Sequence, residues 1–129
     1  MSLPYSMPNT TSYLEDLGII ETKYSGIPTL ESLEITIQEC FRIAREKSTF
    51  LFLGDCTELS GGGSPLDMYQ MARMYEEIPE SRLVKEAIIL PISDKGIEDM
   101  KFYETTTRNR GFNVRLFNNR QTAIDWLKE

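Results

Sequence analysis

Histidine is absent from this sequence of 129 residues, and cysteine occurs only twice, as Cys40 and Cys56. Without histidine the chain has no Ser-His or Cys-His nucleophile pair and no imidazole for acid–base catalysis. The two cysteines lie far apart and no CxxC motif occurs, which excludes the usual zinc sites. We therefore expect two reduced, buried thiols, no metal, no cofactor, and a protein that is not an enzyme.

Long hydrophobic runs are also lacking. No segment approaches the roughly 20 consecutive apolar residues that a membrane span requires. The N-terminal residues MSLPYSMPNTTS contain no basic segment followed by an apolar one, so they do not form a secretion signal. These two absences predict a cytoplasmic protein without a membrane span.

Basic residues are fewer than acidic ones, 14 against 20, so the net charge is −6. An acidic chain is a poor non-specific binder of nucleic acid, whose phosphates attract basic surfaces. Residues 101–120 are a local exception, with five basic residues and one acidic residue, Glu104. We interpret them as a solvated face, and the alternative is an anion- or partner-binding face.

Strand and helix patterns alternate along the chain. The predicted strands are a hairpin within residues 12–25 around Gly18, then residues 49–56, 87–92 and 113–117; the predicted helices are residues 29–47, 64–78, 93–111 and 120–129. This order, ββαβαβαβα, predicts an α/β fold with a mostly parallel mixed sheet of about five strands and about four helices. We expect one domain over residues 12–129 and a flexible tail over residues 1–11.

The segment GDCTELSGGGSPLD, residues 54–67, places three glycines between a buried strand and a helix. It is not a phosphate-binding loop, because no lysine follows Gly63 and leucine stands at position 66, where a dinucleotide motif needs glycine. Asp55 lies at the carboxyl end of the strand, where active groups of open α/β sheets gather. The acidic pair and the lysine that a phospho-acceptor aspartate needs are missing, so we interpret Asp55 as bonding to nearby amides of the turn.

Several segments together resemble the STAS domain, and most closely its SpoIIAA-like branch, the anti-sigma-factor antagonists. The resemblance covers about residues 13–129 and depends on the helix after GIPTLES, the strand that ends in GD, the loop LSG, the strand AIILPI, and VRLFNNRQTAIDWLKE. It implies a bacterial, non-enzymatic regulatory protein that acts through protein contacts. It also implies phosphorylation, by a partner kinase, of a serine at the start of the helix after the central strand.

Ser64 lies near the register of that serine, and Ser60 and Thr57 are weaker candidates. The family usually has an Asp-Ser-Ser-Gly-like motif there, whereas this chain has Gly-Ser-Pro at residues 63–65. An alternative function of Ser64 is to cap the helix, which explains the succession of serine, proline and Asp67.

The helix over residues 64–78 is rich in methionine and has apolar residues on more than one face. One interpretation places Leu66, Met71, Ala72 and Tyr75 in the core, with Met68 and Met74 half-covering it. The alternative is a contact surface formed by Met68, Met71, Met74 and Tyr75, either for a partner or homodimer, or as the lip of an apolar cavity.

We therefore predict a regulatory or interaction module that acts through the loop 57–64 and the following helix. The alternative is a protein that binds a small, lipid-like apolar ligand in a pocket beside the same helix, since the Sec14-type lipid-transfer fold is related in outline.

Overall fold

The computed structural model describes residues 9–129. Residues 1–8 of the expected flexible tail lie outside the described residues. The last part of that tail belongs to the fold, because the first strand begins at Thr10 and Asn9 is buried, where its amide nitrogen donates a hydrogen bond of 3.1 Å to the Thr36 hydroxyl. The domain therefore starts before the expected boundary at residue 12.

The order of the elements confirms the predicted succession of five strands and four α-helices. The elements are β1 (Thr10–Leu14), β2 (Ile19–Gly26), α1 (Leu30–Lys47), β3 (Leu51–Leu59), α2 (Pro65–Glu76), a short 3₁₀ helix η1 (Pro79–Leu83), β4 (Lys85–Ile89), α3 (Asp94–Arg108), β5 (Asn113–Phe117) and α4 (Arg120–Leu127). None of the helices in residues 9–129 is long and apolar enough to cross a membrane.

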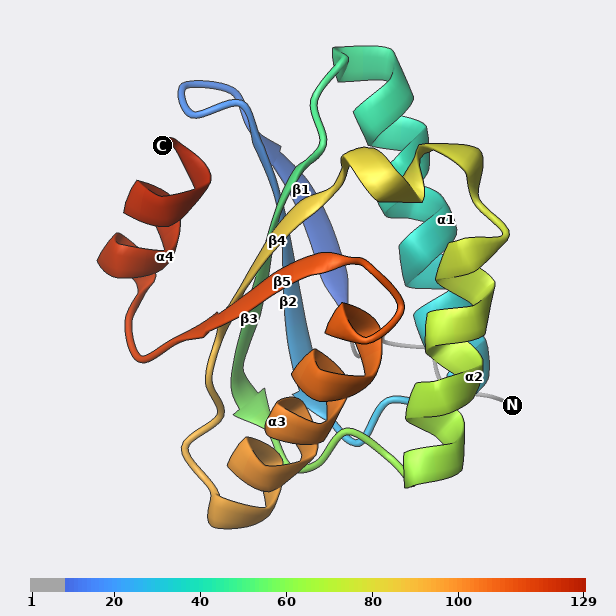
Figure 1. Cartoon of the computed structure of the whole chain (residues 1–129). Coiled ribbons are helices and arrows are strands. Elements are labelled where there is room, and N and C mark those ends of the chain that lie inside the picture. The colour runs from blue at the N-terminus through green and yellow to red at the C-terminus, as the bar shows by residue number, and fades with distance from the viewer. Residues whose placement is uncertain (1–8) are drawn as a thin grey trace, which may run out of the picture.

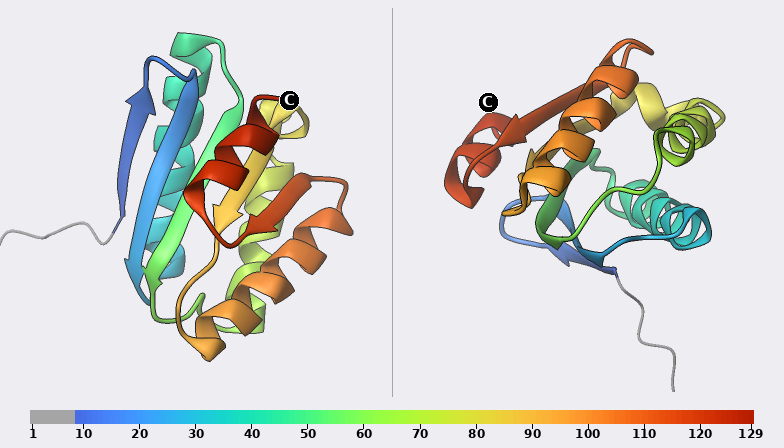
Figure 2. Two further views of the ribbon diagram at one scale, coloured as in Figure 1. Left: turned by 90° about the vertical axis from the view of Figure 1, so that its left-hand side faces the viewer. Right: turned by 90° about the horizontal axis from the view of Figure 1, so that it is seen from below.

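The five strands form one sheet in the order β1-β2-β3-β4-β5. The hairpin strand β1 is antiparallel to β2, and β2, β3, β4 and β5 are parallel to one another. Each parallel step moves in the same direction, so right-handed crossovers place α1, α2 and α3 on one face of the sheet. Helix α4 follows the last strand and covers the other face (Figure 1, Figure 2).

Local signals explain where the elements begin and turn. Gly18 has a φ of 67°, which glycine adopts without strain, in the turn between β1 and β2. The Thr29 hydroxyl accepts a hydrogen bond of 3.0 Å from the Ser32 amide and caps α1. The first turn of α2 has both a capping serine, Ser64, and a proline at position 65, so its start is fixed by the sequence.

Two apolar cores result, one on each face of the sheet. Successive strand residues point to opposite faces, so Phe52 and Ile88 face α1, α2 and α3, while Leu53 and Ile89 face α4. The core under α4 is the smaller one and consists of Ile19, Leu53, Ala87, Ile89, Ala123 and Leu127. The larger core contains the candidate functional site.

Candidate functional site

Asp55 lies in the middle of the central strand β3 and bonds to a residue of the same strand. The strand β3 continues to Leu59, beyond the expected end at residue 56. The Asp55 carboxylate accepts hydrogen bonds from the Thr57 amide at 3.0 Å and from the Thr57 hydroxyl at 2.7 Å. The expected bond to a nearby amide is present, but it lies within β3, so the expectation that the strand ends at Asp55 and turns there is wrong. The two bonds hold Thr57 against the Asp55 carboxylate.

Ser64 caps α2 in a reciprocal arrangement. Its hydroxyl accepts a hydrogen bond of 3.1 Å from the Asp67 amide, and the Asp67 carboxylate accepts one of 3.3 Å from the Ser64 amide. Such a capping box satisfies two amides that the helix itself leaves unpaired. These hydrogen bonds confirm the interpretation of Ser64 as a helix cap. The side chains of Ser64 and Ser60 are both exposed.

The glycine loop, which contains Gly61, Gly62 and Gly63, passes close to α2 and α3 at Gly62. The Gly62 amide donates a hydrogen bond of 3.0 Å to the Asp99 carboxylate on α3, which is itself paired with Lys95 at 2.8 Å. A Cβ atom on residue 62 would lie 2.4 Å from the Met68 methyl carbon and 2.9 Å from that of Met100. A side chain at residue 62 would therefore require the ends of these two flexible methionines to shift.

The methionine-rich helix α2 buries a different face from the one expected. Met68, Met71, Ala72 and Tyr75 are buried at the spacing i, i+3, i+4, i+7, which defines one face of a helix. The expectation that Leu66 fills the core and Met68 only half-covers it is wrong, because Leu66 is 63% exposed and Met68 is 2% exposed. Two residues along a helix are about 200° apart, so these two side chains point to opposite sides.

An outward contact surface formed by Met68, Met71 and Tyr75 is therefore excluded. Met74 is half-buried and packs against the same core. Met68, Met71 and Tyr75 instead line a cavity beneath α2.

This cavity lies beneath α2, between the helix layer and the sheet. The cavity has a volume of about 40 Å³, which is enough for a few water molecules. Its lining is mostly apolar and includes Leu33, Ile37, Met68, Met71, Ile88 and Met100. Its polar groups are a carboxyl, three phenols and a thiol, on Glu86, Tyr24, Tyr75, Tyr103 and Cys56.

Glu86 is the exceptional residue in this lining. It lies on β4, is 6% exposed, and accepts a hydrogen bond of 2.7 Å on its Oε1 atom from the Tyr103 hydroxyl. Burial raises the pKa of Glu86 from 4.5 to about 7, because the charged form loses its hydration, and the Tyr103 hydrogen bond opposes this rise. A buried carboxyl with a strongly shifted pKa inside a pocket is a candidate functional group.

The other ionisable groups of the cavity remain neutral at physiological pH. Burial, with a smaller contribution from the negative charge of Glu86, raises the pKa of Tyr24, Tyr75 and Tyr103 well above that of a free phenol. Burial also raises the pKa of Cys56, so its thiol is a poor nucleophile. Both cysteines are free and buried, as expected, and burial raises the pKa of Cys40 to about 11.

Sequence reasoning missed Glu86, Tyr24 and Tyr103. The predicted strand started at residue 87, one residue too late to include the glutamate. A signal was available, since Val84, Glu86 and Ile88 alternate with period two and share one face of the strand. The two tyrosines come from β2 and α3, and no sequence spacing connects them to β4.

The basic residues between 101 and 120 are largely engaged within the chain. Arg110 pairs with Glu76 and lies 4.6 Å from the centre of the Tyr69 ring. Arg120 pairs with Glu21, and Arg115 lies over the Phe117 ring. These contacts favour the interpretation of a structural and solvated face over an anion-binding one.

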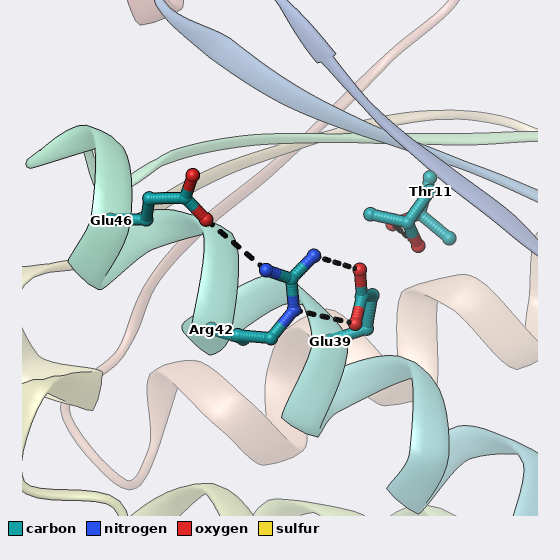
Figure 3. Close-up of polar contacts among 5 residues, drawn as sticks. Thr11, Glu39, Arg42 and Glu46 are labelled. Atoms are coloured by element: carbon teal, nitrogen blue, oxygen red, sulfur yellow. Dashed lines mark hydrogen bonds and ion pairs between the residues drawn. The ribbon is translucent and has the colours of Figure 1, made fainter.

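The outer face of α1 carries a further charged cluster (Figure 3). The Arg42 guanidinium lies between Glu39 and Glu46 on the same helix, bonded to Glu39 at 2.6 Å and to Glu46 at 3.1 Å. All three side chains are exposed, and such pairs one helical turn apart contribute only a few tenths of a kcal/mol. Within residues 9–129, no cluster of three or more acidic or cysteine side chains is arranged to hold a metal ion.

Comparison with known proteins gives a fold and no family assignment. A scan against protein-family models found no match, and a search of curated proteins found none either. The structure is similar to the crystal structure of an uncharacterized protein from the DUF3478 family, described as having a SpoIIAA-like fold, from Shewanella loihica PV-4. The alignment covers 98% of both chains at 20% identity with a TM-score of 0.57. The chain therefore has the SpoIIAA-like fold that its sequence motifs implied.

Proposed function

We propose that this protein is a cytoplasmic, non-enzymatic binding protein that takes a small apolar molecule into the cavity beneath α2. The observation that carries the proposal is the composition of this cavity: apolar walls from four or more elements and a few convergent polar groups around Glu86. Ligand sites in proteins usually combine a mainly apolar lining with a small number of placed polar groups.

The walls of the cavity are suited to adjustment. Met68, Met71 and Met100 contribute flexible thioether side chains that can repack around a guest. The helix α2 packs between α1 and α3, and its N-terminal connection is the glycine loop (Figure 2). A guest larger than a few waters enters when these methionines move, and no main-chain hydrogen bond of the sheet has to break.

Toluene is a direct probe of this function, because it has an apolar ring and no polar head. We expect saturable shifts of the Met68, Met71 and Met100 methyl signals in NMR spectra when toluene is added. The variant Ile88→Phe fills the cavity and should weaken the binding at least about tenfold, whereas Ile124→Phe, the same change on the α4 side, should leave it unaltered. Absence of saturable shifts in the wild type, with toluene and with its amine, alcohol and carboxylate analogues alike, would overturn the proposal.

A second candidate function is contact with a protein partner or a second copy through the loop 57–64 and the outer face of α2. It is favoured by the exposed Ser64 at the start of that helix and by Leu66 and Tyr69, which are 63% and 44% exposed beside it. A phosphate on Ser64 would add nearly two negative charges next to Asp67 and would compete with the capping box. Phosphorylation of Ser64 would then switch this contact at the start of α2, the helix that covers the cavity.

Mass measurement of the intact protein from its own host tests the switch. A phosphate increment that maps to Ser64, and disappears in Ser64→Ala but persists in Ser60→Ala, would support it. Leu66→Glu combined with Tyr69→Glu tests the contact surface, since both side chains are exposed and the fold should persist. Unchanged elution on sizing and unchanged partner capture would exclude this face.

A further inference from the structure

Among residues 9–129, no lysine or arginine forms an ion pair with the cavity carboxyl of Glu86. The arginines and lysines that form ion pairs in residues 9–129 are paired elsewhere: Arg42 with Glu39 and Glu46, Arg45 with Glu80, Lys95 with Asp99, Arg110 with Glu76, Arg120 with Glu21. Glu86 instead accepts a hydrogen bond from a neutral phenol, that of Tyr103. A carboxylate buried without a counter-charge is costly, and a buried ion pair with good geometry offsets that cost.

The ionisable groups that share the cavity with Glu86 are neutral. The same cavity is lined by Tyr24 from β2, Cys56 from β3, Tyr75 from α2 and Tyr103 from α3, and the charge of Glu86 also influences Cys40 on α1. All of these have pKa values raised by burial, so at neutral pH the carboxyl is the group of this set that changes its charge. The Glu86 carboxylate would repel an anionic ligand at this position, whereas it could form an ion pair with a cationic one.

We propose that the ligand of the cavity is a small apolar molecule with a primary amine at one end, and that the Glu86 carboxylate forms an ion pair with its ammonium group. This inference depends on the proposed binding function and names the class of its ligand. The apolar body would contact the methionine-lined walls, and Tyr103 would hold the carboxylate in position through its existing hydrogen bond. Glu86 is then a binding residue, and the cavity selects by charge as well as by shape.

Binding of such an amine has a consequence for protons. Free Glu86 has a raised pKa of about 7, so it is mostly protonated at pH 6.5. An ammonium group beside it favours the ionised form, so binding at pH 6.5 should release a proton from Glu86 to the buffer. A ligand without a charge releases none.

Four compounds with one aromatic ring and different heads test the inference: benzylamine, benzyl alcohol, benzoate and toluene. At pH 8 we expect benzylamine to bind wild-type protein at least about tenfold more tightly than toluene, benzyl alcohol or benzoate in calorimetric titrations. At pH 6.5, titrations in two buffers of different ionisation enthalpy should reveal proton release for benzylamine and none for toluene. Glu86→Gln should reduce benzylamine affinity to that of toluene and abolish the proton release.

Glu21→Gln is the matched control, because Glu21 is the other buried glutamate and lies on the opposite face of the sheet. It should keep the preference for benzylamine. If toluene binds while benzylamine has no advantage or releases no proton, the inference is overturned and the proposed function remains. If none of the four compounds binds the wild type, both are overturned. The proton-release measurement needs only wild-type protein, so it decides the question even if Glu86→Gln does not fold.

Discussion

The two faces of the sheet each bury a glutamate, and the two residues differ in what they contact. Glu21, facing α4, forms an ion pair with Arg120 that includes a hydrogen bond of 3.1 Å between Nη2 and Oε1. Glu86, facing α2, contacts the Tyr103 hydroxyl and the open space of the cavity. A paired carboxylate is part of the structure that holds α4 to the sheet. Glu86 forms no ion pair within residues 9–129 and lies beside a space, and it is the group that we propose for ligand binding.

The apolar packing of the two faces differs in the same way. Under α4, small and large side chains such as Ala87, Ala123 and Leu127 fill the layer, and Trp126 packs against Phe117. Under α2, methionines and tyrosines surround an unfilled space. One face is closely packed and the other retains room, and three comparisons of variants test this difference.

The largest effect is expected from truncating adjacent isoleucines of β4. Ile89→Ala opens a cavity in the close-packed layer and should lower the free energy of unfolding by about 4 kcal/mol. Ile88→Ala removes the same atoms beside an existing space, where they have fewer contacts to lose, and should cost about 2 kcal/mol. Urea unfolding of both variants measures the difference. Equal losses would mean that the two faces are packed alike.

Removing the cation on the α4 side should have the next largest effect. Arg120→Ala leaves the buried Glu21 without its partner and should destabilise the fold by about 3 kcal/mol, at the lower end for broken buried pairs because Arg120 is half exposed. Arg45→Ala, which breaks the more exposed pair with Glu80, should cost less than about 1 kcal/mol. Thermal unfolding of the two variants compares them, and a similar loss in both would refute a special role for the Glu21 pair.

The smallest of the three effects is a pH dependence contributed by Glu86. Its pKa is raised from 4.5 to about 7 on folding, so between these values the folded state holds more protons than the unfolded state, and stability falls as pH rises. Glu86→Gln removes this contribution. From pH 5 to pH 8, the wild type should lose about 2 kcal/mol more than the variant in denaturant unfolding. Parallel pH profiles would contradict a raised pKa at this position.

Most of the fold could be predicted from the hydrophobic periodicity of the sequence and from its turn and helix-capping residues. The order of elements, the hairpin at Gly18 and the cap at Ser64 depend on contacts within a few residues, and these were predicted correctly. The family-like motifs also implied the SpoIIAA-like fold that the structure has. The assignment of Leu66 and Met68 failed because both are apolar, and composition does not reveal which side of a helix meets the sheet.

By itself, the sequence determined the elements and their succession, because capping, turn geometry and hydrophobic spacing are local properties. It also determined that histidine chemistry is absent. Only the tertiary structure decided that Glu86, Tyr24, Tyr75 and Tyr103 meet around one cavity, and that, within residues 9–129, Glu21 forms an ion pair while Glu86 does not. The physical reason is that burial and pairing depend on which distant segments converge, and these residues come from strands and helices separated by long crossovers.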